Sequence, residues 1–228
     1  MGELTLRRRF ESSVGLEIFE VKLADEFLMS SLFTVAEEQL AVLGLASVHG
    51  DQLEVLVGGL GLGYTAVAAL DDARVNSVTV IDALGAVIEW HQQRLLPVSD
   101  RLVSDARTCL VLDDFFDLMR RPQDEGQELA QRYDAILLDV DHSPRHQLAP
   151  SHADLYTSAG LALLDRHLKP AGVFALWSDD PPDDNFMRVL ATVFDSTNAH
   201  VVEFDNPITG GRSSNTVYVA HNAHRALP

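Results

Sequence analysis

A short, mostly apolar run that leads directly into a glycine-rich loop constrains this chain more than any other feature. Leu53–Val57 has the character of a buried strand, and it is followed by Gly58-Gly59-Leu60-Gly61-Leu62-Gly63. Glycine permits backbone conformations that bring the main chain close to a ligand, and segment 64–72 reads as the helix that follows. A strand, a glycine loop and a helix in this order predict an α/β fold in which the first parallel strand ends at a binding site.

The spacing of the glycines separates two classes of nucleotide ligand. The dinucleotide fingerprint is G-x-G-x-x-G. Counted from Gly59, the sixth position is Tyr64, and counted from Gly61 it is Ala66. The shorter pattern G-x-G-x-G holds at Gly59, Gly61 and Gly63. A loop of this form suits the methionine portion of S-adenosylmethionine, which has no pyrophosphate, so we expect S-adenosylmethionine or a close relative as the cofactor.

From residue 53 onward, short apolar runs alternate with helical segments. The runs are Leu53–Val57, Ser77–Ile81, Arg101–Ser104, Ala135–Leu138, Val173–Trp177, His200–Phe204 and Thr216–Ala220. The helical segments are 64–72, 84–95, 106–120, 151–168 and 183–195. Strands that are apolar on both faces and separated by helices indicate a parallel sheet covered on both sides. The last two runs are too close for a crossover helix, which predicts an antiparallel pair. We therefore expect a Rossmann-like, doubly wound, seven-stranded sheet, mostly parallel with an antiparallel last strand.

The first 46 residues follow a different pattern. Thr5–Arg9 and Leu16–Val21 alternate and predict a short β-hairpin. Glu26–Leu45 has apolar residues at helical spacing and predicts a helix with Asp25 as its N-cap. We expect an N-terminal hairpin and helix in 1–46 and a ligand-binding domain in 47–228. The apolar face of the predicted helix suits either packing on the sheet or a homodimer contact.

The composition limits the partners that the chain can have. The chain carries 34 acidic and 17 Lys and Arg residues, a net charge of −17, so we expect no nucleic-acid partner. It has no apolar run of about 18 residues and no apolar signal-peptide core near its start, so we expect no membrane contact. Cys109 is the only cysteine, which excludes an intrachain disulfide. Together these features predict a cytoplasmic protein that acts on a small molecule.

Two acids are placed to contact a nucleoside. Asp82 follows the run Ser77–Ile81 and lies 19 positions after Gly63. An acid at the end of the second strand accepts hydrogen bonds from both ribose hydroxyls, and the same residue can cap the next helix. Asp105 follows the third predicted strand, with Ala106 beside it, where an adenine amino group would lie. For Asp105, a simple helix cap is an equally good interpretation.

The end of the fourth predicted strand carries candidates for the chemistry. Asp139 and Asp141 follow Ala135–Leu138, and ligands of open α/β sheets bind beyond the carboxyl ends of strands. An acid there can deprotonate an ammonium nucleophile or hold a cation. Tyr156, on the next helix, either faces the same cleft or packs in the core. His142 and His146 lack the paired spacing of a metal site, so we expect no metal.

These residues resemble the spermidine synthase family, from about residue 20 to the end of the chain. The matching segments are the glycine loop after Leu53–Val57, Val78–Asp82 with Val87–Glu89 and Leu95–Pro97, Asp105 with Ala106, and Tyr133–Asp139 with Leu155-Tyr156 and Leu168–Gly172. Members transfer an aminopropyl group from decarboxylated S-adenosylmethionine to putrescine. The resemblance implies that Asp82 binds ribose, that Asp105 contacts adenine, that Asp139 is the general base, and that the substrate is a polyamine.

The chain departs from the family mainly on the amine side. The family loop reads G-G-G-D-G-G, and here Gly61 stands in place of the acid. The family motif D-S-S-D is Asp139-Val140-Asp141-His142, so its second acid is either displaced to Asp141 or replaced by His142. The family's glutamine and tyrosine–histidine pair have no clear counterpart in Phe27–Leu40, and its N-terminal β-domain is reduced to about one hairpin.

Three functions follow from the sequence. The leading hypothesis is an aminopropyltransferase, which requires an acidic cleft faced by Asp139 and Asp141. The second is a methyltransferase for a small molecule, which requires room for the cofactor's carboxylate. The third is a non-catalytic nucleoside-binding relative, in which side chains such as Leu60 or Leu62 would fill the pocket.

Overall fold

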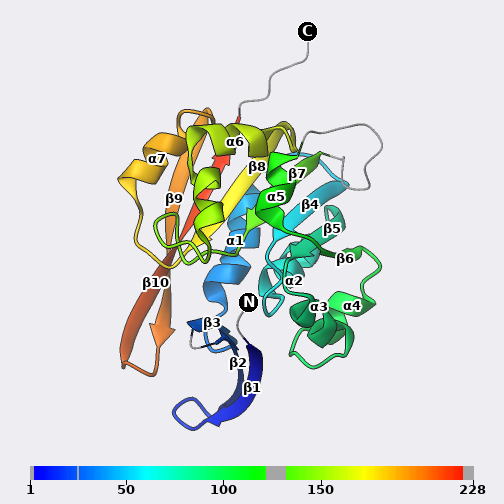
Figure 1. The fold of residues 1–228 in the computed structure, drawn as a ribbon, viewed down its shortest axis with the longest axis vertical. Coiled ribbons are helices and arrows are strands. Elements are labelled where there is room, and N and C mark those ends of the chain that lie inside the picture. The colour runs from blue at the N-terminus through cyan, green and yellow to red at the C-terminus, as the bar shows by residue number, and fades with distance from the viewer. Residues whose placement is uncertain (1–2, 25, 122–131, 223–228) are drawn as a thin grey trace.

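A seven-stranded sheet with the order β6-β5-β4-β7-β8-β10-β9 runs through the molecule (Figure 1). The computed structural model describes residues 3–24, 26–121 and 132–222. The strands of the large sheet are β4 (Leu53–Gly58), β5 (Val75–Asp82), β6 (Thr108–Leu112), β7 (Tyr133–Leu138), β8 (Leu168–Ser178), β9 (Ser196–Asn206) and β10 (Gly211–His221). The helices are α1 (Val35–Ala46), α2 (Tyr64–Asp71), α3 (Gly85–Gln92), α4 (Ser99–Ser104), α5 (Phe115–Arg120), the 3-10 helix Pro150–Tyr156, α6 (Ser158–Asp165) and α7 (Asp184–Leu190).

The pairing of the strands confirms the predicted fold class. Strands β6, β5, β4, β7 and β8 are parallel neighbours, and β10 runs antiparallel to both β8 and β9. Helices cover both faces. The core on one face includes side chains from α1, α2 and α3, and the core on the other includes side chains from α5, α6 and α7. The sheet is therefore doubly wound, and the carboxyl ends of its parallel strands share one edge.

The last two strands extend past the sheet. β10 pairs with β9 from Gly211 to His221 but with β8 only from Thr216 onward. The segments Val202–Asn206 and Gly211–Asn215 therefore form a two-stranded projection, which we call the β9–β10 arm. In Figure 1 it reaches toward the end of the molecule that holds the N-terminal strands.

The N-terminal part contains one strand more than predicted. β1 (Leu4–Glu11), β2 (Leu16–Leu23) and β3 (Glu26–Ser30) form an antiparallel sheet. The predicted helix over Glu26–Leu45 was wrong in its first nine positions, because 26–30 pair with β2 and α1 begins at Val35. The predicted N-cap, Asp25, lies outside the described residues. Val35 and Val42 on α1 are half exposed, and the homodimer stays a prediction.

The third strand of the large sheet was also misplaced in the sequence interpretation. Residues 101–104 belong to α4, where Leu102 is fully buried. The strand is instead β6, Thr108–Leu112, which pairs with Val78–Asp82 of β5. β6 has one neighbour and is partly exposed along its length, so its burial does not enforce a continuously apolar sequence. Among the described residues, no helix combines the length and the apolar character that crossing a bilayer requires.

Candidate active site

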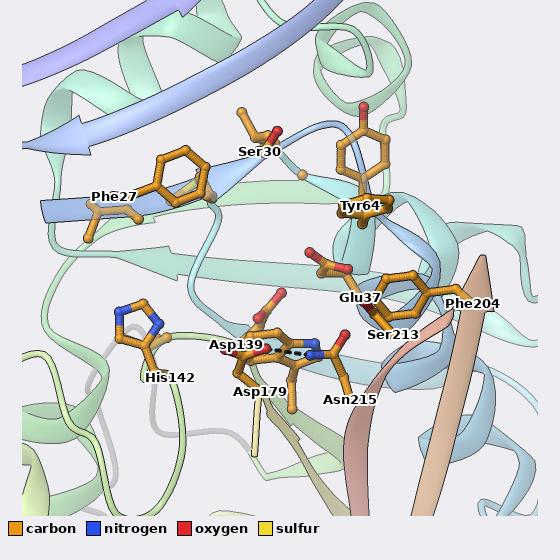
Figure 2. Close-up of a pocket in the computed structure, with 18 of the residues that line it drawn as sticks. Phe27, Ser30, Glu37, Tyr64, Asp139, His142, Asp179, Phe204, Ser213 and Asn215 are labelled. Atoms are coloured by element: carbon orange, nitrogen blue, oxygen red, sulfur yellow. Dashed lines mark hydrogen bonds between the residues drawn. The ribbon is translucent and has the colours of Figure 1, made fainter. Parts of the chain in front are cut away.

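A cavity of about 600 Å³ opens at the carboxyl ends of β4, β7 and β8. Its walls come from the glycine loop, β3, the start of α1, the segment after β7, the end of β8 and the β9–β10 arm. The lining residues include Phe27, Met29, Ser30, Phe33, Glu37, Leu60–Tyr64, Asp139, Val140, His142, Trp177, Asp179, Phe204 and Arg212–Asn215. Figure 2 shows the side chains around the cavity and labels ten of them. Phe33 and Phe204, whose ring centroids are 5.3 Å apart, join the N-terminal wall to the arm.

The glycine loop has the backbone that its sequence predicts. Gly59, Gly61 and Gly63 have φ values of 91°, 48° and 90°, in the left-handed region. A Cβ at Gly59 would lie 2.0 Å from the carbonyl oxygen of Asp139. A Cβ at Gly61, where the family has an acid, would lie 3.2 Å from the sulfur of Met29. The loop is therefore pressed against the end of β7, and Met29 takes up part of the space that an acid would need.

Asp82 anchors this loop. It lies at the end of β5, and its Oδ2 accepts hydrogen bonds from the N–H groups of Leu60 (2.9 Å) and Gly61 (3.4 Å). Its Oδ1 accepts one from the N–H of Leu84 (2.7 Å). Burial raises the pKa of the Asp82 carboxyl, and these backbone donors oppose the rise. A carboxylate has about four lone-pair sites, and three are taken here, so this anchor retains capacity for about one ribose hydroxyl. The ribose contact itself stays a prediction.

The sequence interpretation missed a histidine, His91, that contacts the same loop. His91 of α3 is fully buried, and its Nε2 lies 3.0 Å from the carbonyl oxygen of Gly61. Its Nδ1 lies 3.1 Å from Ser99 Oγ, which in turn accepts the N–H of Leu96. These hydrogen bonds are mutually consistent when His91 Nε2–H donates to the carbonyl oxygen of Gly61 and His91 Nδ1 accepts from the hydroxyl of Ser99. Burial lowers the pKa of His91, which favours that neutral form. No local signal distinguishes such a histidine from any other in a helix.

Asp139 lines the cavity at the end of β7. Its Oδ2 accepts a hydrogen bond from Thr65 Oγ1 at 2.8 Å, and the same hydroxyl lies 3.2 Å from the carbonyl oxygen of Glu37. Burial raises the pKa of Asp139 to about 6, with the Thr65 hydrogen bond acting in the opposite direction. A carboxylate with such a pKa is mostly ionised at neutral pH and can still accept a proton, which suits a general base.

Two further carboxyl groups line the cavity. Burial, followed by the charge of Asp139, raises the pKa of Glu37 to about 8. Asp179 follows β8 and accepts a hydrogen bond from Asn215 Nδ2 at 2.8 Å. Asp179 could have been found from the sequence, because it follows an apolar run just as Asp139 does. Glu37 could not, because it lies on a helix that the fold brings in from the N-terminal side. Among the described residues, no three His, Cys, Asp or Glu side chains are grouped so as to hold a metal ion.

The structure corrects the placement of Asp141 and Tyr156, neither of which lines the cavity. Asp141 is buried and accepts hydrogen bonds from Leu148 N–H and Tyr156 O–H, both at 2.7 Å. His152 Nδ1 also lies within hydrogen-bond distance of this carboxyl group, 2.7 Å from Asp141 Oδ1. β7 ends at Leu138, so alternation does not put Asp139 and Asp141 on one face. Asp141 instead ties the loop after β7 to the 3-10 helix Pro150–Tyr156.

We expect Tyr156→Phe to lower the free energy of unfolding by about 1–3 kcal/mol, because Asp141 loses a buried donor. Burial, followed by the charge of Asp141, raises the pKa of Tyr156 well above its usual value, so its hydroxyl stays a donor. Urea unfolding measures the effect. Affinity for a nucleoside should stay unchanged. If the variant instead has wild-type stability and reduced turnover, Tyr156 takes part in the reaction.

Asp105 and Ala106 lie at the wrong end of their strand for an adenine contact, because β6 starts at Thr108 and they precede it. The Asp105 carboxylate pairs with Arg107 at 2.7 Å, and Arg107 also donates to the carbonyl oxygens of Leu70 and Val75. Asp105 therefore helps to fix the amino end of the strand.

The residues that occupy the carboxyl end of β6 are Asp113 and Asp114. The N–H of Asp113 donates to the carbonyl oxygen of Asp82 at 3.2 Å, and Asp114 caps α5. The apolar run 108–112 followed by two acids was the signal that could have located them.

Comparisons with known proteins agree with this architecture. No protein-family model matches the chain. A curated relative, the polyamine aminopropyltransferase of Prochlorococcus marinus (strain NATL1A), is 27% identical over 146 residues, which is 62% of this chain and 47% of the relative. The chain thus spans about half the length of that relative.

Solved structures match over most of the chain. The spermidine synthase from Thermotoga maritima has a TM-score of 0.72 at 19% identity, over 96% of this chain and 70% of that one. A spermidine synthase in complex with the transition state analogue AdoDATO has a TM-score of 0.70 at 19% identity, over 96% and 69%. Human methyltransferase-like protein 13 in complex with SAH has a TM-score of 0.58 at 18% identity, over 86% and 83%. At these identities the structural matches establish the fold. Together with the curated relative, they show that the chain is similar to spermidine synthases and has a methyltransferase-like fold.

Proposed function

We propose that this protein transfers an aminopropyl group from decarboxylated S-adenosylmethionine to an amine. The observation that carries the proposal is the cavity beside the glycine loop, which three carboxyl groups line, those of Glu37, Asp139 and Asp179. Within the described residues, none of the three forms an ion pair with a Lys or Arg side chain. Arg212 also lines the cavity, but its guanidinium pairs with Glu203 at 3.0 Å.

The charge of this cavity discriminates between the two forms of the cofactor. Both forms carry a sulfonium and an ammonium group, and only the intact form carries a carboxylate. A carboxylate placed among three acids is repelled, whereas an ammonium group is attracted. The cavity therefore favours the decarboxylated cofactor and a cationic acceptor. Leu60 and Leu62 line the cavity and also pack in hydrophobic clusters, and a cavity of about 600 Å³ stays open beside them, whereas a non-catalytic relative would have it filled by such side chains.

The reaction needs positioning and one proton acceptor. The lone pair of the acceptor nitrogen attacks the methylene carbon next to the sulfonium, and the C–S bond breaks as the C–N bond forms. The electron pair of the C–S bond stays on sulfur, which leaves a neutral thioether nucleoside. The proton that the nitrogen loses goes to the Asp139 carboxylate. The glycine loop and Asp82 hold the nucleoside so that the displacement is in line, which is the larger part of such catalysis. The curated relative is named for this transfer.

Calorimetric titration of the protein with S-adenosylmethionine and, in parallel, with its decarboxylated form tests the proposal. We expect tighter binding of the decarboxylated form, followed by aminopropyl transfer when diamines and polyamines are supplied. Tighter binding of the intact form would redirect the search to methyl acceptors. Binding of neither form would contradict a transferase and leave a non-catalytic protein.

We expect Asp82→Ala to weaken binding of decarboxylated S-adenosylmethionine by about 1–3 kcal/mol, through the loss of a charge-assisted hydrogen bond to the ribose and of the loop's own anchor. Calorimetry measures the affinity. Asp105→Ala is the matched control, because Asp105 lies at the opposite end of the neighbouring strand, and its affinity should equal that of the wild type. If both variants bind the cofactor as tightly as the wild type does, Asp82 does not bind the ribose.

A further inference from the structure

The carboxyl group of Glu37 is one of the three that line the cavity. α1 carries it into the cavity, and no hydrogen bond from another described residue reaches its side chain. Its neighbour Glu38 is exposed and accepts a hydrogen bond from Thr34 Oγ1 at 2.8 Å. Two adjacent glutamates thus face different surroundings, and only Glu37 faces the site. Figure 2 shows Glu37 and Asp139 in the same part of the cavity, between β3 and the strand that carries Ser213 and Asn215.

Thr65 lies between Asp139 and the backbone of Glu37. The Thr65 hydroxyl is within hydrogen-bond distance of both Asp139 Oδ2 and the backbone carbonyl of Glu37, which fixes the start of α2 between the two acids. Two carboxyl groups that share a site with little solvent cannot both be ionised without cost, so one of them retains its proton. The titratable and charged groups that line the cavity with Glu37 are Asp139, Asp179, Tyr64, His142 and Arg212. Arg212 belongs to the exposed arm and is already paired with Glu203.

We infer that Glu37 is a catalytic-site residue that binds the ammonium group of the acceptor amine and releases its own proton to solvent when the amine enters. The inference rests on the proposed function and deepens it, because it names the second acid of the acceptor site. Burial and the Asp139 charge, which raise the pKa of Glu37 to about 8, mean that Glu37 is mostly protonated at neutral pH in the empty site. An ammonium group supplies the positive charge that favours the carboxylate, so Glu37 exchanges a proton for the cation.

Titration calorimetry with 1,4-diaminobutane tests this exchange. The full chain is titrated at neutral pH in two buffers with different ionisation enthalpies, in the presence of 5′-methylthioadenosine, the nucleoside that the proposed transfer leaves behind. We expect the wild type to release about one proton per diamine bound. Glu37→Gln should release none and bind the diamine at least about tenfold more weakly, since a neutral amide cannot form the charge-assisted hydrogen bond. Glu38→Gln, the neighbouring control, removes a charge that makes a small contribution to the raised pKa of Glu37, so it should keep most of the proton release and nearly the wild-type affinity.

Thermal unfolding at a series of pH values provides a second readout that also shows whether the variant folds. A carboxyl group whose pKa is higher in the folded state contributes stability that is complete below its unfolded pKa and is lost as the pH rises through its folded pKa. For Glu37 this window runs from 4.5 to about 8. We expect the Tm of the wild type to fall relative to that of Glu37→Gln as the pH rises through this window. Above the window the difference between the two Tm values should stay constant. Glu38→Gln should show no such trend.

The outcomes separate the inference from the proposed function. Proton release that persists in Glu37→Gln, unchanged diamine affinity in that variant, or no diamine binding by the wild type would each overturn the role of Glu37. If the wild type transfers aminopropyl groups while the variant keeps the wild-type KM for the amine, the proposed function stands and the inference fails. If diamine binds with Glu37-dependent proton release but no transfer occurs, Glu37 keeps its role and the proposed function fails.

Discussion

Gly59→Ala is expected to lower the free energy of unfolding by about 2–5 kcal/mol and to abolish nucleoside binding. A side chain at φ 91° costs about 1–2 kcal/mol in backbone strain. The new Cβ would also lie 2.0 Å from the Asp139 carbonyl oxygen, which is backbone and cannot move aside cheaply. Forcing an atom into a packed site adds about 1–3 kcal/mol. Urea unfolding, with calorimetry for the nucleoside, measures both losses.

Gly50→Ala is the matched control for this variant. Gly50 has φ 100°, and a Cβ there would meet no atom within 4 Å. We therefore expect Gly50→Ala to lower the free energy of unfolding only by the backbone strain, about 1–2 kcal/mol, and to bind the nucleoside as the wild type does. Equal losses in the two variants would mean that the contact with Asp139 does not hold the loop.

Asp139→Asn is expected to lower kcat by about 10²–10⁴-fold while the affinity for decarboxylated S-adenosylmethionine stays close to that of the wild type. An amide cannot accept the proton that the amine loses, and general bases contribute about this factor. The Thr65 hydroxyl can still donate to an amide oxygen, so the geometry of the site should persist. Steady-state kinetics and calorimetry measure the two quantities.

The pH dependence of the wild type gives an independent check on Asp139. Because burial raises its pKa to about 6, activity should fall as the pH decreases through that value, and Asp139→Asn should lose this dependence. Asp179→Asn is the comparison variant, since Asp179 lines the cavity without contacting Thr65, and it should raise the KM for the amine more than it lowers kcat. Full turnover by Asp139→Asn would exclude Asp139 as the base.

Features that depend only on residues close together in the sequence could be predicted from it. The glycine loop, Asp82 and Asp139 each follow an apolar strand directly, and the short connection before β10 indicates its antiparallel direction. β6 was misplaced because an edge strand with one partner is only partly buried, which weakens its apolar pattern.

Features that depend on distant packing were not predictable. Glu37 enters the site through the way α1 packs on the sheet, and Asp141 leaves it because its oxygens are taken by the loop and by Tyr156. The sequence contains each of these residues, but their partners lie elsewhere along the chain.

The β9–β10 arm has a consequence for the timing of ligand capture during synthesis. The cavity takes its walls from β3 and α1, which leave the ribosome before the glycine loop, and from Phe204 and Arg212–Asn215, which leave it after β8. A nascent chain that has completed the glycine loop and β8 still has one side of the cavity open to water. Since a ligand stabilises only the state that it binds, a ligand that touches both sides of the cavity stabilises the chain fully only after the arm has been made.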